Sequence, residues 1–327
     1  MAQQGPLEDK LVVLIGGGGF VGTHLAQELL RRDARLRIAE RHPEKAFNLR
    51  PLANLGQIQF TRCDVTHRPS LEAAIAGADA VVYLVGSFGR GQEALHATGA
   101  QIAAQAAAEN GAQAFVYISA LGADPASDST YASTKGRGEE LVRAAFPGAT
   151  VLRPSILFGE DDNFINLFAG LIGGLPIVPV FGGDARLQPA WVDDAADAAA
   201  NALADPRNHG GKTYELTGPE VLTMRELHIR IARAQGRDRR FLAMPDGLAR
   251  LFAALPGTPM NADQWKLLRR GTVATGTLPG LAELGVAARP LDLFLDRWMI
   301  RYRRYGRFTQ AGSGTGTGTD TGAGTGA

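Results

Sequence analysis

The sequence predicts an α/β fold built on a doubly wound parallel sheet, with a smaller C-terminal lobe. Apolar, β-branched runs alternate with helical stretches from Lys10 to Pro154, which is the pattern of a parallel sheet with helices on both faces. The first of these runs enters a glycine-rich turn and then a helix. After Pro154 the alternation gives way to a stretch rich in glycine and proline, and we expect the lobe there.

The expected elements follow from hydrophobic periodicity and from helix start and stop signals. We predict strands at residues 11–15, 36–39, 58–61, 80–85, 114–119 and 150–152, and helices at 23–32, 71–75 and 98–109. In the lobe we expect helices at 192–203 and 224–235. Thr223 stands three residues before Glu226 and predicts a capping box at the start of the second of these. Asp193 and Asp194 are expected to cap the first.

Composition excludes several classes of function. The chain of 327 residues carries 34 Lys and Arg against 33 Asp and Glu, so its net charge does not favour nucleic acid as a partner. Cys63 is the single cysteine, which excludes internal disulfides and cysteine-ligated iron–sulfur or zinc sites, and we predict no metal site. The N-terminus lacks the pattern of a signal peptide, and the most apolar stretch, 164–183, is interrupted by Gly and Pro. We therefore expect neither a signal peptide nor a transmembrane helix.

The glycine-rich turn is the first candidate binding feature. Gly16, Gly19 and Gly22 stand at three-residue spacing between the first strand and the first helix. Backbone N–H groups and a helix N-terminus at such a turn can hold a pyrophosphate, and glycine permits the close backbone approach. By itself the pattern also fits a tight turn that binds nothing. Further cofactor contacts are expected from Phe20 and Val21 beside the turn, from Val85 and Gly86 after the fourth strand, and from Pro154 after the sixth.

Residues after the second strand bear on which dinucleotide binds. Glu40 ends that strand and favours NAD, because an acid there can hold the ribose 2′-OH. Three basic residues follow at once and can pair with a 2′-phosphate: Arg41, His42 and Lys45. We interpret this balance as favouring NADP(H) over NAD.

Asp64 ends the third strand and is the candidate contact for the adenine ring. Its carboxylate is placed to accept from the adenine amino group, and Val65 is placed to pack on the ring. Taken alone, Asp64 fits equally well as an acid that leads into a helix.

Tyr131 and Lys135 form the candidate catalytic pair. They are four residues apart and therefore share one face of a helix. A phenol with a pKa of about 10 exchanges protons poorly at neutral pH, and a neighbouring ammonium group stabilises the phenolate. Ser119, at the end of the fifth strand, can hold a substrate oxygen. The spacing also arises by chance in many helices, so the combination with the glycine turn predicts cofactor contact and leaves turnover open.

Together the glycine turn, Asp64, Ser119 and Tyr131-x-x-x-Lys135 resemble the extended and atypical short-chain dehydrogenase/reductase superfamily, which has a Rossmann-type fold. Other segments look like the NAD(P)H-binding accessory subunit of respiratory complex I: residues 49–52, 55–57, 145–149, 153–161, 188–189, 192–194 and 298–308. The resemblance covers residues 11–308. We expect an N-terminal extension (1–9), a dinucleotide-binding domain (10–154), the lobe with a basic segment (155–308, which can cross back to the sheet) and a disordered Gly/Thr-rich tail (309–327).

The resemblance implies a non-catalytic subunit of a bacterial NADH:ubiquinone oxidoreductase that holds NADPH as a structural ligand. It implies other complex I subunits as partners, and a peripheral position on the cytoplasmic face of the bacterial inner membrane. The segment from Arg297 to Phe308 interleaves arginines with aromatic residues and can dock on lipid headgroups or on an acidic partner. A solvated basic helix face is the other interpretation of that segment.

Two other functions fit the same residues. A free-standing NAD(P)-dependent reductase or sugar-nucleotide epimerase/dehydratase would use Ser119, Tyr131 and Lys135 catalytically. A redox-sensing module, in which cofactor occupancy changes partner binding, is the third hypothesis. The sequence names no substrate, because the lobe offers no convergent set of charged residues that we can assign to a ligand.

Overall fold

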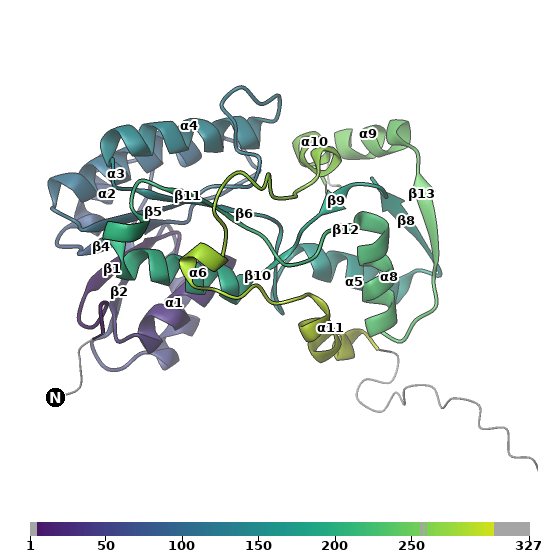
Figure 1. The fold of residues 1–327 in the computed structure, drawn as a ribbon, viewed down its shortest axis with the longest axis horizontal. Helices are drawn as coiled ribbons and strands as arrows, with labels where there is room; N and C mark the ends of the chain where they lie inside the picture. The colour runs from purple at the N-terminus through teal and green to yellow at the C-terminus, as the bar shows by residue number, and fades with distance from the viewer. Residues whose placement is uncertain (1–4, 256–257, 259, 304–327) are drawn as a thin grey trace, which may run out of the picture.

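A sheet of seven parallel strands positions the site. In the computed structural model, which describes residues 5–255, 258 and 260–303, its order is β11-β6-β5-β4-β1-β2-β3 (Figure 1). The strands are β1 (Leu11–Ile15), β2 (Arg35–Glu40), β3 (Ile58–Arg62), β4 (Ala80–Tyr83), β5 (Ala114–Ile118), β6 (Thr150–Pro154) and β11 (Thr213–Leu216). Strand order reverses at β1, which pairs with both β2 and β4. Ligands of open α/β sheets bind at the carboxyl ends of the strands beside such a reversal.

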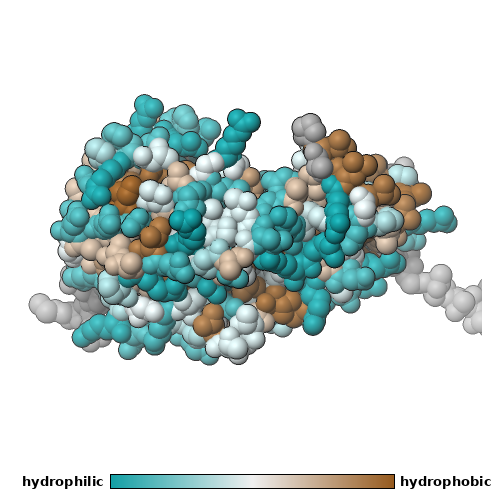
Figure 2. Space-filling model, turned by 90° about the horizontal axis from the view of Figure 1, so that it is seen from above, coloured by the Kyte–Doolittle hydropathy of each residue, from teal (hydrophilic) through white to brown (hydrophobic). Residues whose placement is uncertain are grey.

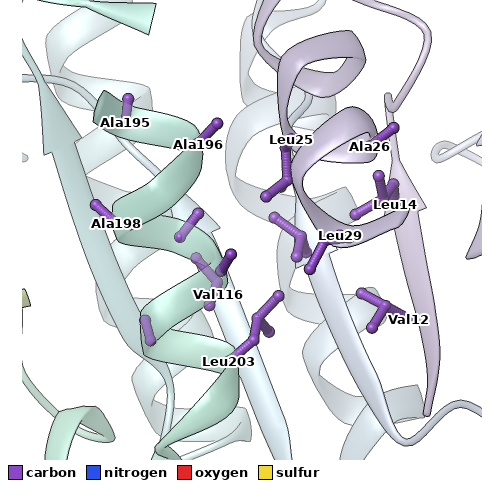
Figure 3. Packing of buried hydrophobic residues seen from close by; sticks show 14 of the residues in the cluster. Val12, Leu14, Leu25, Ala26, Leu29, Val116, Ala195, Ala196, Ala198 and Leu203 are labelled. Carbon is purple, nitrogen blue, oxygen red and sulfur yellow. The ribbon is translucent and has the colours of Figure 1, made fainter. Parts of the chain in front are cut away.

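Helices cover both faces of this sheet. Successive side chains of β1 point to opposite faces, so each face has apolar residues for the helices to pack on. Val12 and Leu14 belong to a core cluster with α1 (Phe20–Arg31) and α6 (Val192–Ala204), and Figure 3 shows these two helices packed over the strands. Val13 and Ile15 belong to the opposite cluster, with α2 (Arg68–Ile75), α3 (Gly99–Glu109) and α4 (Thr130–Ala145). The predicted fold class is confirmed.

The elements predicted before Pro154 form where they were expected. Each predicted strand overlaps one of β1 to β6, and the helices predicted at 23–32, 71–75 and 98–109 overlap α1, α2 and α3. One turn of π-helix, Ala94–Thr98, leads into α3, and a 3₁₀ helix, Pro43–Leu52, follows β2.

Two segments after Pro154 return to the sheet. The helix predicted at 192–203 forms as α6, but it packs on α1 rather than in the lobe where we expected it. Its small, buried alanine side chains let it lie close to α1. Strand β11, which the sequence analysis did not predict, pairs with β6. The predicted boundary between the dinucleotide-binding domain and the lobe, at residues 154 and 155, stays a prediction.

The lobe has a core of its own, enclosed by α5 (Phe164–Gly174), α8 (Met224–Ala234) and α11 (Asp292–Met299). Trp191 stacks on Phe294 there, with ring centroids 3.8 Å apart. The predicted capping box of α8 is confirmed, since Thr223 Oγ1 accepts from the Glu226 backbone N–H at 3.1 Å and the Thr223 N–H donates to the Glu226 carboxylate at 2.7 Å.

The rest of the lobe extends the molecule away from the sheet. Strand β13 (Arg240–Met244) pairs in parallel with β8 (Ile177–Phe181), and α9 (Asp246–Ala254) and α10 (Ala262–Arg270) follow, with α10 beside the start of α4 (Figure 1). The short elements are β7 (Leu157–Phe158), β9 (Arg186–Leu187), β10 (Ala190–Trp191), β12 (Leu222–Thr223) and α7 (Pro206–His209). Within the described ranges, no helix is long and apolar enough to cross a membrane.

The described part of the C-terminal basic segment packs into the lobe. Trp298 is buried, Tyr302 donates a hydrogen bond to α5 at 3.1 Å, and Arg303 Nε donates to the last turn of α8 at 3.0 Å. The remaining members of the segment, Arg304, Tyr305, Arg307 and Phe308, lie outside the described residues, as does the tail predicted to be disordered at 309–327. Docking through residues 297–308 therefore stays a prediction.

Candidate nucleotide site

The glycine turn lies at the carboxyl end of β1 and has the geometry that the sequence analysis expected. Gly16 has a φ of +82°, which favours glycine. A Cβ added to Gly22 would stand 2.5 Å from the backbone of Gly17, so only glycine lets α1 cross the turn. Gly19 is the N-cap of α1, and neither a side-chain cap nor an acid in the first turn competes for that helix end. A pyrophosphate fits this helix N-terminus.

The residues after β4 lie between the glycine turn and the Tyr131–Lys135 pair. A Cβ added to Gly16 would meet the Val85 side chain at 3.2 Å, so the turn and the β4 end are adjacent. A Cβ added to Gly86 would stand 3.7 Å from Tyr131 Oη and 3.8 Å from Lys135 Nζ. Glycine therefore leaves open the space between the turn and the pair, as a bound dinucleotide requires.

Lys135 is fixed by two backbone carbonyls. Its Nζ donates to Ile118 O at 2.7 Å and to Val85 O at 3.0 Å, and the side chain is buried. Burial lowers the pKa of Lys135 to about 7, although the charge of Glu139 acts in the opposite direction. Burial raises the pKa of Tyr131 to about 12. The phenol is therefore protonated at neutral pH, and Lys135 loses its proton far more readily than an exposed lysine.

Ser119 does not hydrogen-bond Tyr131 but joins a buried ion pair. Its hydroxyl donates to Glu139 Oε1 at 2.5 Å, and Glu139 is 2% exposed. Arg153 binds the same carboxylate with Nε at 2.8 Å and Nη2 at 2.7 Å, and this hydrogen bonding raises the pKa of Arg153. Sequence reasoning missed both partners. The spacing of Tyr131, Lys135 and Glu139 on one helix face, each four residues after the last, was the available signal.

Two aromatic residues that the sequence analysis did not single out hold Tyr131. Phe88 stacks on its ring with centroids 4.2 Å apart, and His96 meets it edge-on at 5.2 Å. His96 Nε2 accepts from the Ser87 N–H at 3.0 Å, and its Nδ1 lies 2.9 Å from Thr134 Oγ1. Burial lowers the pKa of His96 to about 3. A neutral His96 thus ties the loop after β4 to α4.

The lobe also contacts the helix that carries Tyr131. The Asp263 carboxylate, at the start of α10, accepts from the backbone N–H groups of Thr130 at 2.8 Å and of Tyr131 at 2.9 Å. A carboxylate at a helix N-terminus satisfies free N–H groups and interacts favourably with the helix dipole. Because Asp263 is distant in sequence, no local pattern could have revealed this contact.

Residues after β2 and β3 surround the expected position of the adenosine. Glu40 Oε1 accepts from the Gly18 N–H at 2.8 Å, so the carboxylate is turned toward the glycine loop. Arg41 and Lys45 are exposed, and neither has an ion pair within the described ranges, whereas His42 Nδ1 lies 3.3 Å from the Glu44 carboxylate. These positions bring both an acid and free cations to the site.

Asp64 is exposed at the end of β3, and Val65 beside it is buried. One Asp64 oxygen accepts from Thr66 Oγ1 at 2.7 Å and from the Thr66 N–H at 2.9 Å. These hydrogen bonds lower the pKa of Asp64. The carboxylate remains an acceptor at neutral pH, and its contact with an adenine amino group stays a prediction.

The remaining predicted cofactor contacts lie around the same edge of the sheet. Phe20 and Val21 open α1, and Pro154 ends β6.

The two acids at the start of α6 do not have the capping role that the sequence analysis expected. Asp193 and Asp194 do not cap α6, whose N-cap is Trp191 without a side-chain hydrogen bond. Instead, Asp193 binds His24 Nδ1 at 2.5 Å, and Asp194 is buried and accepts from Arg289, including its backbone N–H at 2.8 Å. Tertiary partners decided these roles.

Comparison with known proteins agrees with this geometry. The NAD(P)H-binding family profile matches residues 16–168, which run from the glycine turn into α5. Over 321 residues the chain is 29% identical to "NADH dehydrogenase [ubiquinone] 1 alpha subcomplex subunit 9, mitochondrial" of Arabidopsis thaliana, covering 90% of this chain and 79% of the relative. The chain is a homologue of the NAD(P)H-binding accessory subunit of respiratory complex I. This family is part of the extended short-chain dehydrogenase/reductase superfamily.

Two reductases are similar as well. The chain is 28% identical over 263 residues to a ceramide reductase of Caulobacter vibrioides, covering 76% of this chain and 80% of that protein. The triphenylmethane reductase of Citrobacter sp., solved with NADP(H), superposes with a TM-score of 0.72 at 19% identity, covering 88% of this chain and 99% of that one. The second likeness shows a shared fold.

Proposed function

We propose that this protein is a non-catalytic accessory subunit of a bacterial respiratory NADH:ubiquinone oxidoreductase, in which it holds NADPH as a ligand that is not consumed. Its homology to a complex I subunit over 90% of the chain supports this assignment. Its partners would be other complex I subunits, and its position would be peripheral, on the cytoplasmic face of the inner membrane.

The observation that best supports the non-catalytic role is the hydrogen bond from the Ser119 hydroxyl to Glu139. The Ser119 hydroxyl donates to a buried carboxylate 2.5 Å away that also binds Arg153, so the proton of that hydroxyl is already engaged within the protein. Tyr131 is covered by Phe88, and burial raises its pKa to about 12. Proton transfer at neutral pH is most effective when the pKa of the donor lies near the working pH.

The same residues suit a bound dinucleotide. The N-terminus of α1 would hold the pyrophosphate, and the space beside Gly86 would admit the nicotinamide ribose within reach of Tyr131 and Lys135. When bound, the nicotinamide supplies hydride chemistry. A ligand that binds only the folded state stabilises it by mass action without any turnover.

NADPH rather than NADH is favoured by the charges after β2. Glu40 is held toward Gly18, whereas Arg41 and Lys45 are exposed and unpaired within the described part of the chain. Arg41→Ala should therefore weaken NADPH binding by about tenfold or more, as expected for a lost charge-assisted hydrogen bond, and leave NADH binding unchanged. Arg207→Ala, an exposed arginine on α7, is the matched control.

The direct test is recovery of the tagged protein from native membranes in mild detergent, followed by mass spectrometry of its partners and of any bound nucleotide. We expect quinone-reductase subunits and one NADPH per chain that added quinone or aldehyde does not oxidise. Recovery of the chain alone from the soluble fraction would refute the subunit assignment. Recovery with NADH or with no nucleotide would refute the ligand assignment.

A free-standing NAD(P)-dependent reductase is the second candidate, favoured by the similarity to ceramide reductase and by the adjacent Tyr131 and Lys135. It predicts that Tyr131→Phe abolishes a measurable carbonyl reduction and leaves NADPH affinity nearly unchanged. A Ser119→Ala variant separates the two candidates further. It should be inactive if Ser119 holds a substrate, and it should lose only stability if Ser119 serves the ion pair.

A further inference from the structure

A basic groove lies between α9 and α10, on the side of the lobe where α10 meets the start of α4 (Figure 1). Four cationic side chains line it, Arg250, Lys266, Arg269 and Arg270, together with Trp265. We call this the α9–α10 groove. Asp128, in the loop before α4, also lines it, and neither the proposed function nor the sequence analysis assigns the groove a role.

The acids beside the groove do not balance its positive charge. Arg270 pairs with Asp128 at 2.5 Å, and Arg269 pairs with Asp246 at 3.5 Å. Lys266 Nζ donates to the backbone carbonyl of Asp128 at 2.7 Å, and this uncharged partner leaves the positive charge of Lys266 in place. Arg250 is exposed and has no ion pair within the described ranges. Four cations thus face two carboxylates, and the groove keeps a positive charge that suits an anion.

Trp265 lines the groove and has an indole N–H that is unpaired among the described residues. The residue is 4% exposed, and its indole Nε1 has no hydrogen-bond partner in the described part of the chain. Buried indole N–H groups ordinarily find a partner.

Exposed aliphatic side chains stand next to these cations. On α9, Leu248 and Leu251 are 51% and 60% exposed, and their spacing of three residues puts them on one helix face. Leu255, the C-cap that follows α9, is 52% exposed. Leu242 on β13 and Ile177 on β8 are 57% and 54% exposed and lie on paired strands. We call these five residues the leucine face. Figure 2 shows hydrophobic surface gathered at this end of the molecule, bordered by hydrophilic residues.

We infer that the α9–α10 groove and the leucine face together bind the surface of an anionic lipid bilayer. The groove would hold the phosphate of a headgroup, and the leucines would enter the boundary between headgroups and acyl chains. A short amphipathic helix with an aliphatic face and flanking arginines has the composition of an interfacial membrane helix.

A bilayer explains this surface better than a protein partner. Protein interfaces centre on aromatic and arginine anchors seated in pockets, and leucine is under-represented among their energetic centres. The leucine face presents separate, protruding aliphatic side chains, which a fluid bilayer accommodates without a matching shape. The inference is independent of nucleotide binding and differs from the earlier prediction for residues 297–308, because its residues lie on α9, α10, β8 and β13.

The test is sedimentation of the purified full chain with vesicles of phosphatidylcholine, alone or mixed with phosphatidylglycerol. We expect binding only to the mixed vesicles, reversed by high salt. Each cation near an anionic surface contributes about fivefold in affinity, so Arg250→Glu should weaken binding by about tenfold or more. Leu251→Ser should weaken vesicle binding by about tenfold, because the variant no longer transfers a leucine side chain from water into the bilayer.

Matched controls distinguish this surface from general charge and hydrophobicity. Arg207→Glu reverses an exposed arginine on α7, and Leu55→Ser replaces a fully exposed leucine near β3; both should bind vesicles like the wild type. The proposal is overturned if the wild type ignores mixed vesicles, if the controls lose as much binding as the test variants, or if removal of residues 304–327 abolishes binding. Arg250-dependent binding of inorganic phosphate without vesicle binding would also overturn it.

Discussion

Replacing Glu139 with alanine tests whether the buried ion pair, rather than a catalytic role, explains Ser119. Glu139 is 2% exposed and accepts one hydrogen bond from Ser119 and two from Arg153. Breaking a buried pair by removing one partner costs about 3–5 kcal/mol. The Arg153 side chain is 23% exposed, so its guanidinium can partly rehydrate and we expect about 3 kcal/mol.

That loss should be visible in two measurements. Urea unfolding should give a free energy of unfolding lower by about 3 kcal/mol, and thermal unfolding should give a Tm lower by about 4–5 °C for a chain of this size. Glu140→Ala is the control, because Glu140 is the exposed neighbour on the same helix; its effect should stay within about 0.5 kcal/mol. Glu139→Leu combined with Arg153→Leu should be more stable than either single variant, because no charge is left buried alone.

The reasoning fails if Glu139→Ala costs no more than Glu140→Ala. It also fails if the double variant is as unstable as the sum of the single ones, since the two side chains would then not interact. Removal of Glu139 should further lower the pKa of Lys135, because the charge of Glu139 raises it now.

The remaining predictions concern pH and access to the site. Burial lowers the pKa of His24, but hydrogen bonds to Asp193 and Asp161 outweigh it and raise the pKa above 6.5; the stability lost in His24→Gln should therefore be largest below pH 6.5 and shrink as pH rises through the folded pKa. Lys135 has the opposite sign, because its pKa falls from 10.5 unfolded to about 7 folded; its contribution should make the free energy of unfolding rise between these two values, and Lys135→Met should remove that rise. Phe88→Ala should speed nitration of Tyr131, read by mass spectrometry, because it uncovers the ring.

Each of these has a result that contradicts it. A loss in His24→Gln that does not vary with pH would show that the ion pair contributes nothing, and the same slope in Lys135→Met as in the wild type would show that Lys135 keeps its ordinary pKa. Unchanged nitration of Tyr131 in Phe88→Ala would show that Phe88 does not shield it; Phe47→Ala is the control, because that ring is 37% exposed and packs edge-on against Phe60 instead of Tyr131.

Much of the nucleotide site could be predicted from local sequence. The turn at Gly16, Gly19 and Gly22 depends on strand and helix signals within a few residues, and the Tyr131–Lys135 pair depends on helix periodicity alone. The capping box of Thr223 and Glu226 was predicted for the same reason. These features are short in sequence, so the chain pattern determines them before any packing occurs.

The roles of the acids could not be predicted in this way. Asp193 and Asp194 stand where caps commonly stand, yet their partners come from α1 and from Arg289. Asp263 carries no local signal for its contact with the start of α4. Helix spacing puts Glu139 on the face of Tyr131 and Lys135, but it does not indicate Ser119 as the partner. Placing α6 on the sheet likewise required knowing which surface its alanines would meet.

The sequence by itself determined the fold class, the glycine turn, the position of the Tyr–Lys pair and the strands up to β6, because periodicity and glycine geometry act over neighbouring residues. Only the tertiary structure decided that Ser119 serves an ion pair, that Phe88 covers Tyr131, and that the groove and the leucine face lie side by side. Those outcomes depend on which distant side chains share a buried or exposed surface, and burial changes the free energy of every polar and apolar group it brings together.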